Sequence, residues 1–169
     1  MSQIAIEIRP PRLEEADALS QVHDEAWQQA YRGIIPAIAL EKMIARRGPG
    51  RWQEQIRRNR HAHLVLSFGD TLAGYAAIGG ARQRIAGNEG EIYELYLKPE
   101  YQGVGLGRRL FVAARRTLSQ AGRRGLVVWA LMDNEPALRF YDALGGKRIA
   151  TTRETLGNVS LQKQAFIWR

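Results

Sequence analysis

Residues 102–108 read Gln-Gly-Val-Gly-Leu-Gly-Arg, and this glycine-rich stretch decides the fold. It follows an apolar and aromatic run at 92–97 and precedes a segment, 106–122, whose apolar residues recur at helical spacing. A second apolar run occupies 125–132, so the order is strand, turn, helix, strand. Such a unit joins two parallel strands through a right-handed crossover in about 98% of cases. We therefore expect a parallel pair, with the glycine-rich turn at the start of the connecting helix.

The glycines of this turn indicate a phosphate-binding site. Because alternate positions carry no side chain, successive backbone N–H groups can converge on an anion at the helix N-terminus, where the helix dipole also favours negative charge. Two other phosphate motifs do not fit. A dinucleotide-binding turn needs a third glycine where Arg108 stands, and the Gly-Lys-Ser/Thr of a P-loop is absent. Taken alone, the turn is equally compatible with a tight strand-to-helix connection that binds nothing.

The segments on either side predict further strands and helices. Alternating or β-rich runs predict strands at 4–8, 63–68, 71–78, 147–155 and 159–168. Helical spacing predicts helices at 13–31, 37–44, 52–58 and from Asn134 and Pro136 to the glycine pair at 145–146. Gly69-Asp70 and Gly157-Asn158 are two-residue hairpin signals, so the strands flanking each should pair antiparallel.

The composition fits one ordinary domain spanning residues 1–169, with 45% apolar and 25% charged residues. The absence of cysteine excludes disulfides, thiolate metal sites and a cysteine-linked acyl-enzyme. The three histidines lack acidic partners at metal-ligand spacing, so we expect no metal. No apolar run approaches the roughly 20 residues of a membrane helix, and the start of the chain does not read as a secretion signal. We expect a cytoplasmic protein.

The formal net charge of +8 favours anionic partners, either nucleic acid or phosphorylated small molecules. Arginines crowd the segments 46–60 and 108–124, which we interpret mainly as solvated helix faces. A basic nucleic-acid-binding module is a rival interpretation, but no helix-turn-helix or RNA-binding motif supports it. We therefore do not expect nucleic acid to be a partner.

Two motifs in the right order resemble the GNAT N-acetyltransferase superfamily. The turn at 102–108 resembles its Gln/Arg-x-x-Gly-x-Gly/Ala signature, and residues 134–146 are similar to its Asn-x-x-Ala-x-x-Phe-Tyr-x-x-x-Gly-Phe segment, with Lys147 where an aromatic residue is usual. The resemblance covers essentially the whole chain. It implies a single-domain α/β (α+β) fold with a mixed central sheet of about six or seven strands and helices on both faces. Residues 91–97 and 125–130 would form a splayed parallel pair that holds the pantetheine arm of acetyl-CoA.

The resemblance also implies roles for individual residues. Tyr141 would protonate the departing thiolate, and Glu91 or Glu94 would help to deprotonate the amine. Strand alternation places these two carboxylates on opposite faces, but a bulge, common in this strand of the family, would change that parity, so both remain candidates. Trp27 and Tyr31 would line the acceptor pocket. Contacts to the coenzyme are implied for Leu95, Tyr96, Leu97, Gln102, Gly103, Val104, Gly105, Leu106, Gly107, Arg108, Asn134 and Tyr141.

These features together predict an enzyme that transfers an acetyl group from acetyl-CoA to a primary amine. Because no cysteine is available to carry the acyl group, we expect direct attack in a ternary complex. Acetyl-CoA and an amine are the expected partners, and a membrane is not. A GNAT-like protein that binds acyl-CoA without turnover is a further alternative. The sequence leaves open the identity of the amine and the oligomeric state, including a homodimer.

Overall fold

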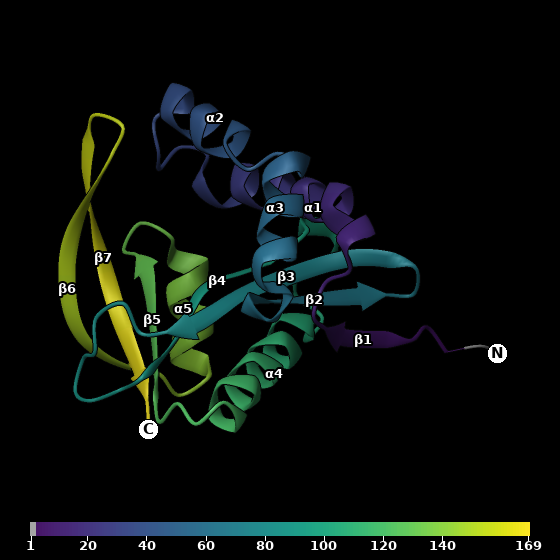
Figure 1. The fold of residues 1–169 in the computed structure, drawn as a ribbon. Coiled ribbons are helices and arrows are strands. Elements are labelled where there is room, and N and C mark those ends of the chain that lie inside the picture. The colour runs from purple at the N-terminus through teal and green to yellow at the C-terminus, as the bar shows by residue number, and fades with distance from the viewer. Residues whose placement is uncertain (1–2) are drawn as a thin grey trace.

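A computed structural model describes residues 3–169, in which seven strands form one mixed sheet of order β1-β2-β3-β4-β5-β7-β6 (Figure 1). The strands are β1 (Ile6–Arg9), β2 (His63–Phe68), β3 (Thr71–Gly80), β4 (Gly90–Leu97), β5 (Leu126–Leu131), β6 (Lys147–Leu156) and β7 (Val159–Trp168). The helices are α1 (Ala16–Tyr31), α2 (Ala37–Ala45), α3 (Pro49–Asn59), α4 (Leu106–Gln120) and α5 (Glu135–Ala143). The predicted α/β fold with its mixed sheet is confirmed.

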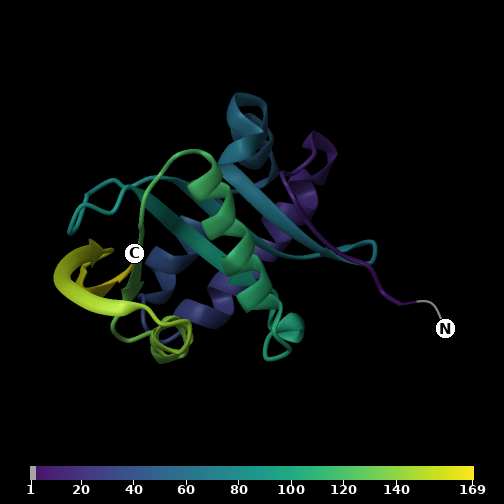
Figure 2. The same ribbon diagram turned by 90° about the horizontal axis from the view of Figure 1, so that it is seen from below.

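Helices cover both faces of the sheet, as predicted. Leu64 and Leu66 of β2 point to one face and pack in the same core as Leu110 of α4, whereas Val65 between them packs with Trp52 of α3 on the other. Figure 2 shows α4 on the opposite side of the strands from α1 and α3. Across residues 3–169, no helix combines the length and the apolar character needed to cross a bilayer.

The predicted hairpins are confirmed, and the start of α3 and the position of β1 differ from the prediction. β2 pairs antiparallel with β3, and β6 pairs antiparallel with β7. Helix α3 begins at Pro49, three residues before the predicted start, because Gly48 serves as its N-cap and proline fits the first turn of a helix. Strand β1 is shifted toward the C-terminus relative to the prediction, since its partner residues in β2 end at Phe68, opposite Ile6.

Strands β4 and β5 form the predicted parallel pair, and they separate after three residue pairs. Gly90, Glu91 and Ile92 lie opposite residues 126–128 of β5. Beyond Ile92, β4 continues to Leu97 paired only with β3, while β5 continues to its end paired only with β7. The sheet is therefore open between these two strands.

Strand β4 carries a bulge that decides where its carboxylates lie. The register of β3 against β4 shifts between Ala77 and Ile78, which leaves Tyr93 as the extra residue. Glu94 contacts Tyr75 on the face covered by α1 and α3, and Glu91 lies on the same face, opposite the α4 core that contains its neighbour at 92. Simple alternation, which puts Glu91 and Glu94 on opposite faces, is wrong here because of the bulge.

Candidate active site

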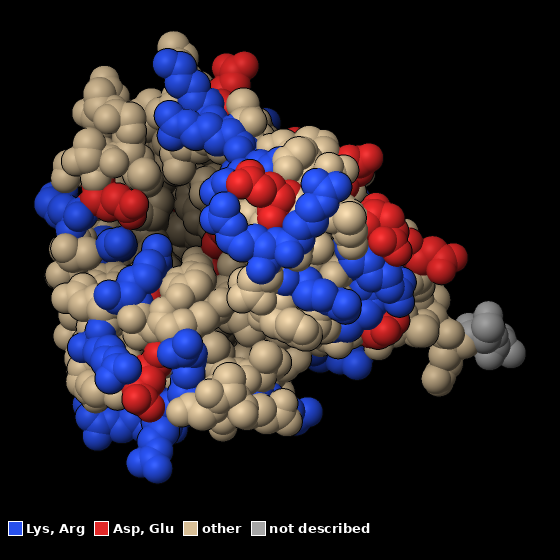
Figure 3. Space-filling view, viewed as in Figure 1, with Lys and Arg blue, Asp and Glu red and all other residues tan. Residues whose placement is uncertain are grey.

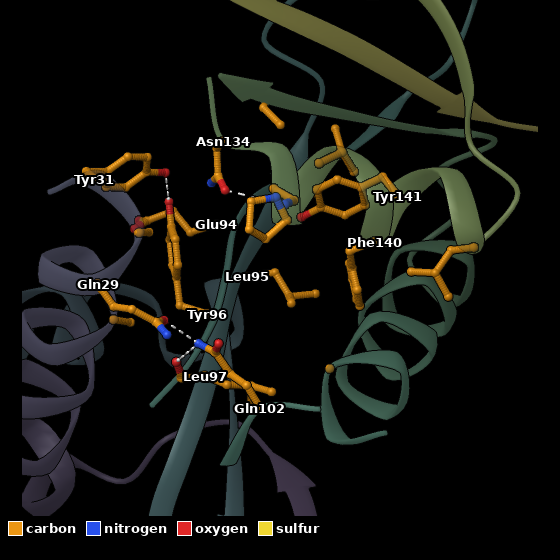
Figure 4. Close-up of a pocket in the computed structure, with 18 of the residues that line it drawn as sticks. Gln29, Tyr31, Glu94, Leu95, Tyr96, Leu97, Gln102, Asn134, Phe140 and Tyr141 are labelled. Carbon is orange, nitrogen blue, oxygen red and sulfur yellow. Dashed lines mark hydrogen bonds between the residues drawn. The ribbon is translucent and has the colours of Figure 1, made fainter. Parts of the chain in front are cut away.

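A cavity of about 620 Å³ occupies the opening between β4 and β5. Its walls come from α1, β4, the glycine-rich turn, β5 and α5, and Figure 4 shows side chains from these elements converging on it. In the space-filling view the molecule is hollowed between the β6–β7 hairpin and the segment that contains α2 and α3 (Figure 3). The two parallel strands thus open onto a space large enough for a small-molecule ligand.

The edge of β4 that faces this cavity has free backbone groups. The Lys98 N–H donates to the Ala73 carbonyl at 2.8 Å, and hydrogen-bonded pairs alternate along an antiparallel ladder, so Leu95 and Leu97 direct their backbone groups away from β3. The Leu97 carbonyl accepts a hydrogen bond from Gln102 Nε2 at 3.1 Å. The N–H and C=O of Leu95 and the N–H of Leu97 remain for an amide-bearing ligand.

The turn before α4 presents a row of unpaired amides. Gly103 and Gly105 have φ values of +78° and +87°, the left-handed region that glycine adopts without strain. Within residues 3–169, the backbone N–H groups of residues 103–108 donate to no other backbone group. They lie just before and within the first turn of α4, a helix of 15 residues whose dipole adds positive potential at the same place. This geometry suits a phosphate or diphosphate group.

The third glycine of the turn has a packing role. A Cβ at Gly103 or Gly105 would meet no atom within 4 Å, so these two residues are glycine for backbone conformation. A Cβ at Gly107 would instead lie 3.2 Å from the ring of Phe140. The side-chain-free position 107 therefore lets α4 approach α5 closely and sets one wall of the cavity.

Tyr141 of α5 points its hydroxyl into the cavity (Figure 4). In the part of the chain that the structure describes, that hydroxyl makes no hydrogen bond. Burial raises the pKa of Tyr141, so its hydroxyl keeps its proton at neutral pH and can donate it. Asn134 lines the same wall, and its Oδ1 accepts a hydrogen bond from the Ala137 N–H at 3.3 Å, which caps α5.

Glu94 lines the opposite side of the cavity and has two partners. Arg47 Nη1 lies 2.7 Å from each carboxylate oxygen, and the Tyr75 hydroxyl donates to Oε2 at 2.7 Å. Sequence analysis assigned the arginines of segment 46–60 mainly to solvated faces and missed this contact. No short-range pattern signals it, since the two residues are 47 positions apart.

Glu91 does not reach the cavity. Its side chain is 1% exposed, and its carboxylate accepts hydrogen bonds from the Arg82 amide at 3.0 Å and from Arg82 Nη2 at 2.5 Å. These contacts fasten the loop after β3 to the first part of β4. Of the two carboxylates named from the sequence, only Glu94 lies on the cavity wall.

The two aromatic residues expected at the acceptor pocket take different positions. Tyr31 is on the cavity wall, where its hydroxyl hydrogen-bonds that of Tyr96, and burial raises the pKa of Tyr31 to about 12. Trp27 lies behind them, with its ring centroid 5.2 Å from that of Tyr31 and 5.8 Å from that of Tyr96. Trp27 therefore supports the wall without lining it, because one helical turn separates it from Tyr31.

The remaining predicted coenzyme contacts divide between side chains and backbone. Leu95, Tyr96, Leu97, Gln102 and Arg108 line the cavity. Val104 is 71% exposed and Leu106 is buried in the core, so these two can contribute only their main-chain amides. Sequence reasoning did not identify Gln29 of α1, whose side-chain oxygen accepts a hydrogen bond from Gln102 Nε2 at 2.7 Å.

Comparison with known proteins agrees with this geometry. The model of the acetyltransferase (GNAT) family matches residues 19–145. The chain belongs to the GNAT family. This GNAT chain is 27% identical over 163 residues to the uncharacterized N-acetyltransferase YuaI of Bacillus subtilis, covering 96% of this chain and 92% of that one. It is 28% identical over 145 residues to spermidine N(1)-acetyltransferase of Thermoplasma acidophilum, with coverages of 85% and 89%.

A solved structure extends the comparison to the whole fold of this GNAT chain. The PaiA N-acetyltransferase of Thermoplasma acidophilum, in complex with coenzyme A, superposes with a TM-score of 0.74 at 25% identity, covering 94% of this chain and 98% of that one. Family and fold together make this chain an acetyl-CoA-dependent N-acyltransferase. The open strand edge, the unpaired turn amides and the free tyrosine hydroxyl fit the arm, the diphosphate and the sulfur of that coenzyme.

Proposed function

We propose that this GNAT enzyme transfers the acetyl group of acetyl-CoA to a primary amine by direct attack within a ternary complex. One observation carries the proposal: the free backbone edge of β4, the unpaired amides of the turn and the Tyr141 hydroxyl all open into the same cavity as Glu94. Bound acetyl-CoA supplies the acetyl group as an activated thioester.

The binding part of the reaction falls to the backbone. Leu95 and Leu97 hold the pantetheine arm through the edge groups that β5 leaves unpaired. The amides of residues 103–108 hold the diphosphate. The Leu95 N–H would also donate to the thioester oxygen, where negative charge develops, and a fixed donor there stabilises the transition state.

Proton transfer falls to two side chains on opposite walls. An alkylamine has a pKa near 10 and is mostly protonated at neutral pH, so it must lose a proton before it attacks. Glu94 accepts that proton, directly or through a water molecule, and Tyr141 gives its proton to the departing sulfur. The second proton, which the nitrogen loses as the amide forms, restores the Tyr141 hydroxyl. The hydroxyl is free for this task, since no protein group hydrogen-bonds it in residues 3–169.

The acceptor amine enters on the side of Tyr31, Tyr96 and Glu94. The relative from Thermoplasma acidophilum named as a spermidine N(1)-acetyltransferase supports a primary amine as acceptor. The acceptors of this enzyme are primary amines, a class that includes polyamines.

Release of free thiol from acetyl-CoA tests the proposal when it is measured across polyamines, amino acids, aminoglycosides and peptides with a free N-terminus. We expect amine-dependent release, with intersecting lines in double-reciprocal plots. Parallel lines or an isolated acetyl-enzyme would contradict direct attack. A protein that is stabilised by coenzyme A but releases no thiol with any amine would be the catalytically silent binder.

A further inference from the structure

Arg47 is a partly buried arginine that no step of the proposed reaction has used. It stands between α2 and α3, and its guanidinium carbon lies 4.8 Å from the ring centroid of Trp52 and 5.9 Å from that of Trp27. The side chain is 19% exposed and that of its partner Glu94 is 16% exposed. An arginine so enclosed by aromatic rings is held in one orientation.

The contacts of Arg47 and Tyr75 leave part of the Glu94 carboxylate free. An ionised carboxylate offers about four acceptor sites. Arg47 takes one on each oxygen and Tyr75 takes a second on Oε2, so the open site is on Oε1. Glu94 lines the cavity and Arg47 does not. Arg47 therefore reaches the carboxylate from behind and leaves one oxygen available to the acceptor.

A partly buried ion pair such as Arg47–Glu94 contributes little to the stability of a fold. Burying two charges removes them from water, and apolar residues of similar volume often stabilise a fold as well or better. The surroundings here are mostly aromatic, with Trp27, Trp52 and Tyr75 packed about the pair. Because Arg47 contacts both carboxylate oxygens, it fixes where the Glu94 carboxylate lies.

We propose that Arg47 is a positioning residue for acyl transfer: it balances the charge of Glu94 and fixes its carboxylate toward the acceptor amine. The inference rests on the proposed function, in which Glu94 accepts the amine proton. By this inference, the turn between α2 and α3 belongs to the catalytic apparatus, although Arg47 touches neither substrate.

Replacement of Arg47 by Met tests this, because Met keeps an unbranched apolar stem and removes the charge. We expect kcat to fall on the order of 100-fold, which is the lower end of what proton-transfer groups contribute, with the KM for acetyl-CoA unchanged. Arg47→Lys should restore part of the lost kcat. Arg46→Met is the matched control, since Arg46 is adjacent, exposed and in no ion pair within residues 3–169.

A double-mutant cycle separates positioning from a general loss of structure. In a Glu94→Gln background, Arg47→Met should cost little more in kcat, because Arg47 acts only through Glu94. Independent, multiplicative losses would overturn the inference, as would an Arg47→Met enzyme with the wild-type kcat. The rise in melting temperature on adding coenzyme A checks folding in each variant. If Arg47→Met does not fold, Arg47→Lys and the double variant decide.

Failure of this inference is distinguishable from failure of the proposed function. If the wild-type protein releases no thiol with any amine, the proposed function falls and this inference with it. If the wild-type enzyme turns over and the Arg47 variants match it, the inference alone falls.

Discussion

Replacement of Gly105 by Val should abolish coenzyme binding, and Gly122→Val provides a control of equal strain. Gly105 and Gly122 have φ values of +87° and +82°, and a Cβ at either position would meet no atom within 4 Å. They lie at opposite ends of α4, and only Gly105 belongs to the turn of unpaired amides. The two substitutions therefore introduce the same backbone strain at different places.

The expected loss of stability follows from the backbone conformation at the two glycines. In the left-handed region a residue with a side chain has a conformational free energy roughly 1–2 kcal/mol higher than glycine, and β-branched Val lies near the upper end of this range. For a chain of this length, 1 kcal/mol shifts Tm by about 2–4 °C, so each variant should melt about 4–8 °C lower than wild type. Coenzyme A at 100 times its Kd adds about 2.7 kcal/mol, a rise of about 5–11 °C.

Differential scanning fluorimetry with and without coenzyme A measures both effects. We expect wild type and Gly122→Val to keep the rise and Gly105→Val to lose it, because relief of strain at position 105 rotates the amides out of convergence. A Gly105→Val protein that retains the full rise would refute the phosphate-binding role of the turn. Loss of the rise in Gly122→Val would show that strain in α4 alone explains the result.

Four other substitutions have outcomes that differ in kind. Tyr141→Phe should lower kcat by roughly 10²–10⁴-fold while the stabilisation by coenzyme A persists; an unchanged kcat would remove the hydroxyl from the reaction. Glu94→Gln should lower thiol release, whereas Glu91→Gln should lower Tm through its contact with Arg82 and leave the rate near wild type; the reverse pattern in steady-state assays would exchange their roles. Burial, assisted by the charge of Arg47, lowers the pKa of His23 from its ordinary 6.5 to about 4, so the unfolded chain binds more protons between these pH values. Stability is therefore complete above pH 6.5 and falls by on the order of 3 kcal/mol as the pH drops to 4; urea unfolding at several pH values should show a shallower slope in His23→Gln, and equal slopes would count against the assignment.

The elements that depend on local patterns were predictable from the sequence. Apolar spacing and hairpin signals placed β2 at the residues where it is found and α2 to within one residue. The parallel pair β4–β5 followed from the strand-helix-strand order and from the handedness of such connections. Local rules suffice where neighbouring residues settle the conformation.

The arrangement of the acceptor side was not predictable, because it depends on contacts between distant residues. The Arg47–Glu94 pair joins the turn between α2 and α3 to a strand residue 47 positions further along the chain, and the two residues of the Tyr31–Tyr96 hydroxyl pair are 65 positions apart. The bulge at Tyr93 moved Glu91 to the same face as Glu94, and alternation alone cannot locate a bulge. Which arginine of a basic segment is buried depends on the tertiary fold.

The parting of β4 from β5 divides the sheet into two leaves, one of β1 to β4 and one of β5, β7 and β6. Three residue pairs and the chain segment through α4 tie the leaves together. An extended molecule with amides of its own, lying along the gap, would supply the missing cross-links between them. On the proposed function the coenzyme takes this place, and it adds cross-links between the two leaves to those made by their shared core.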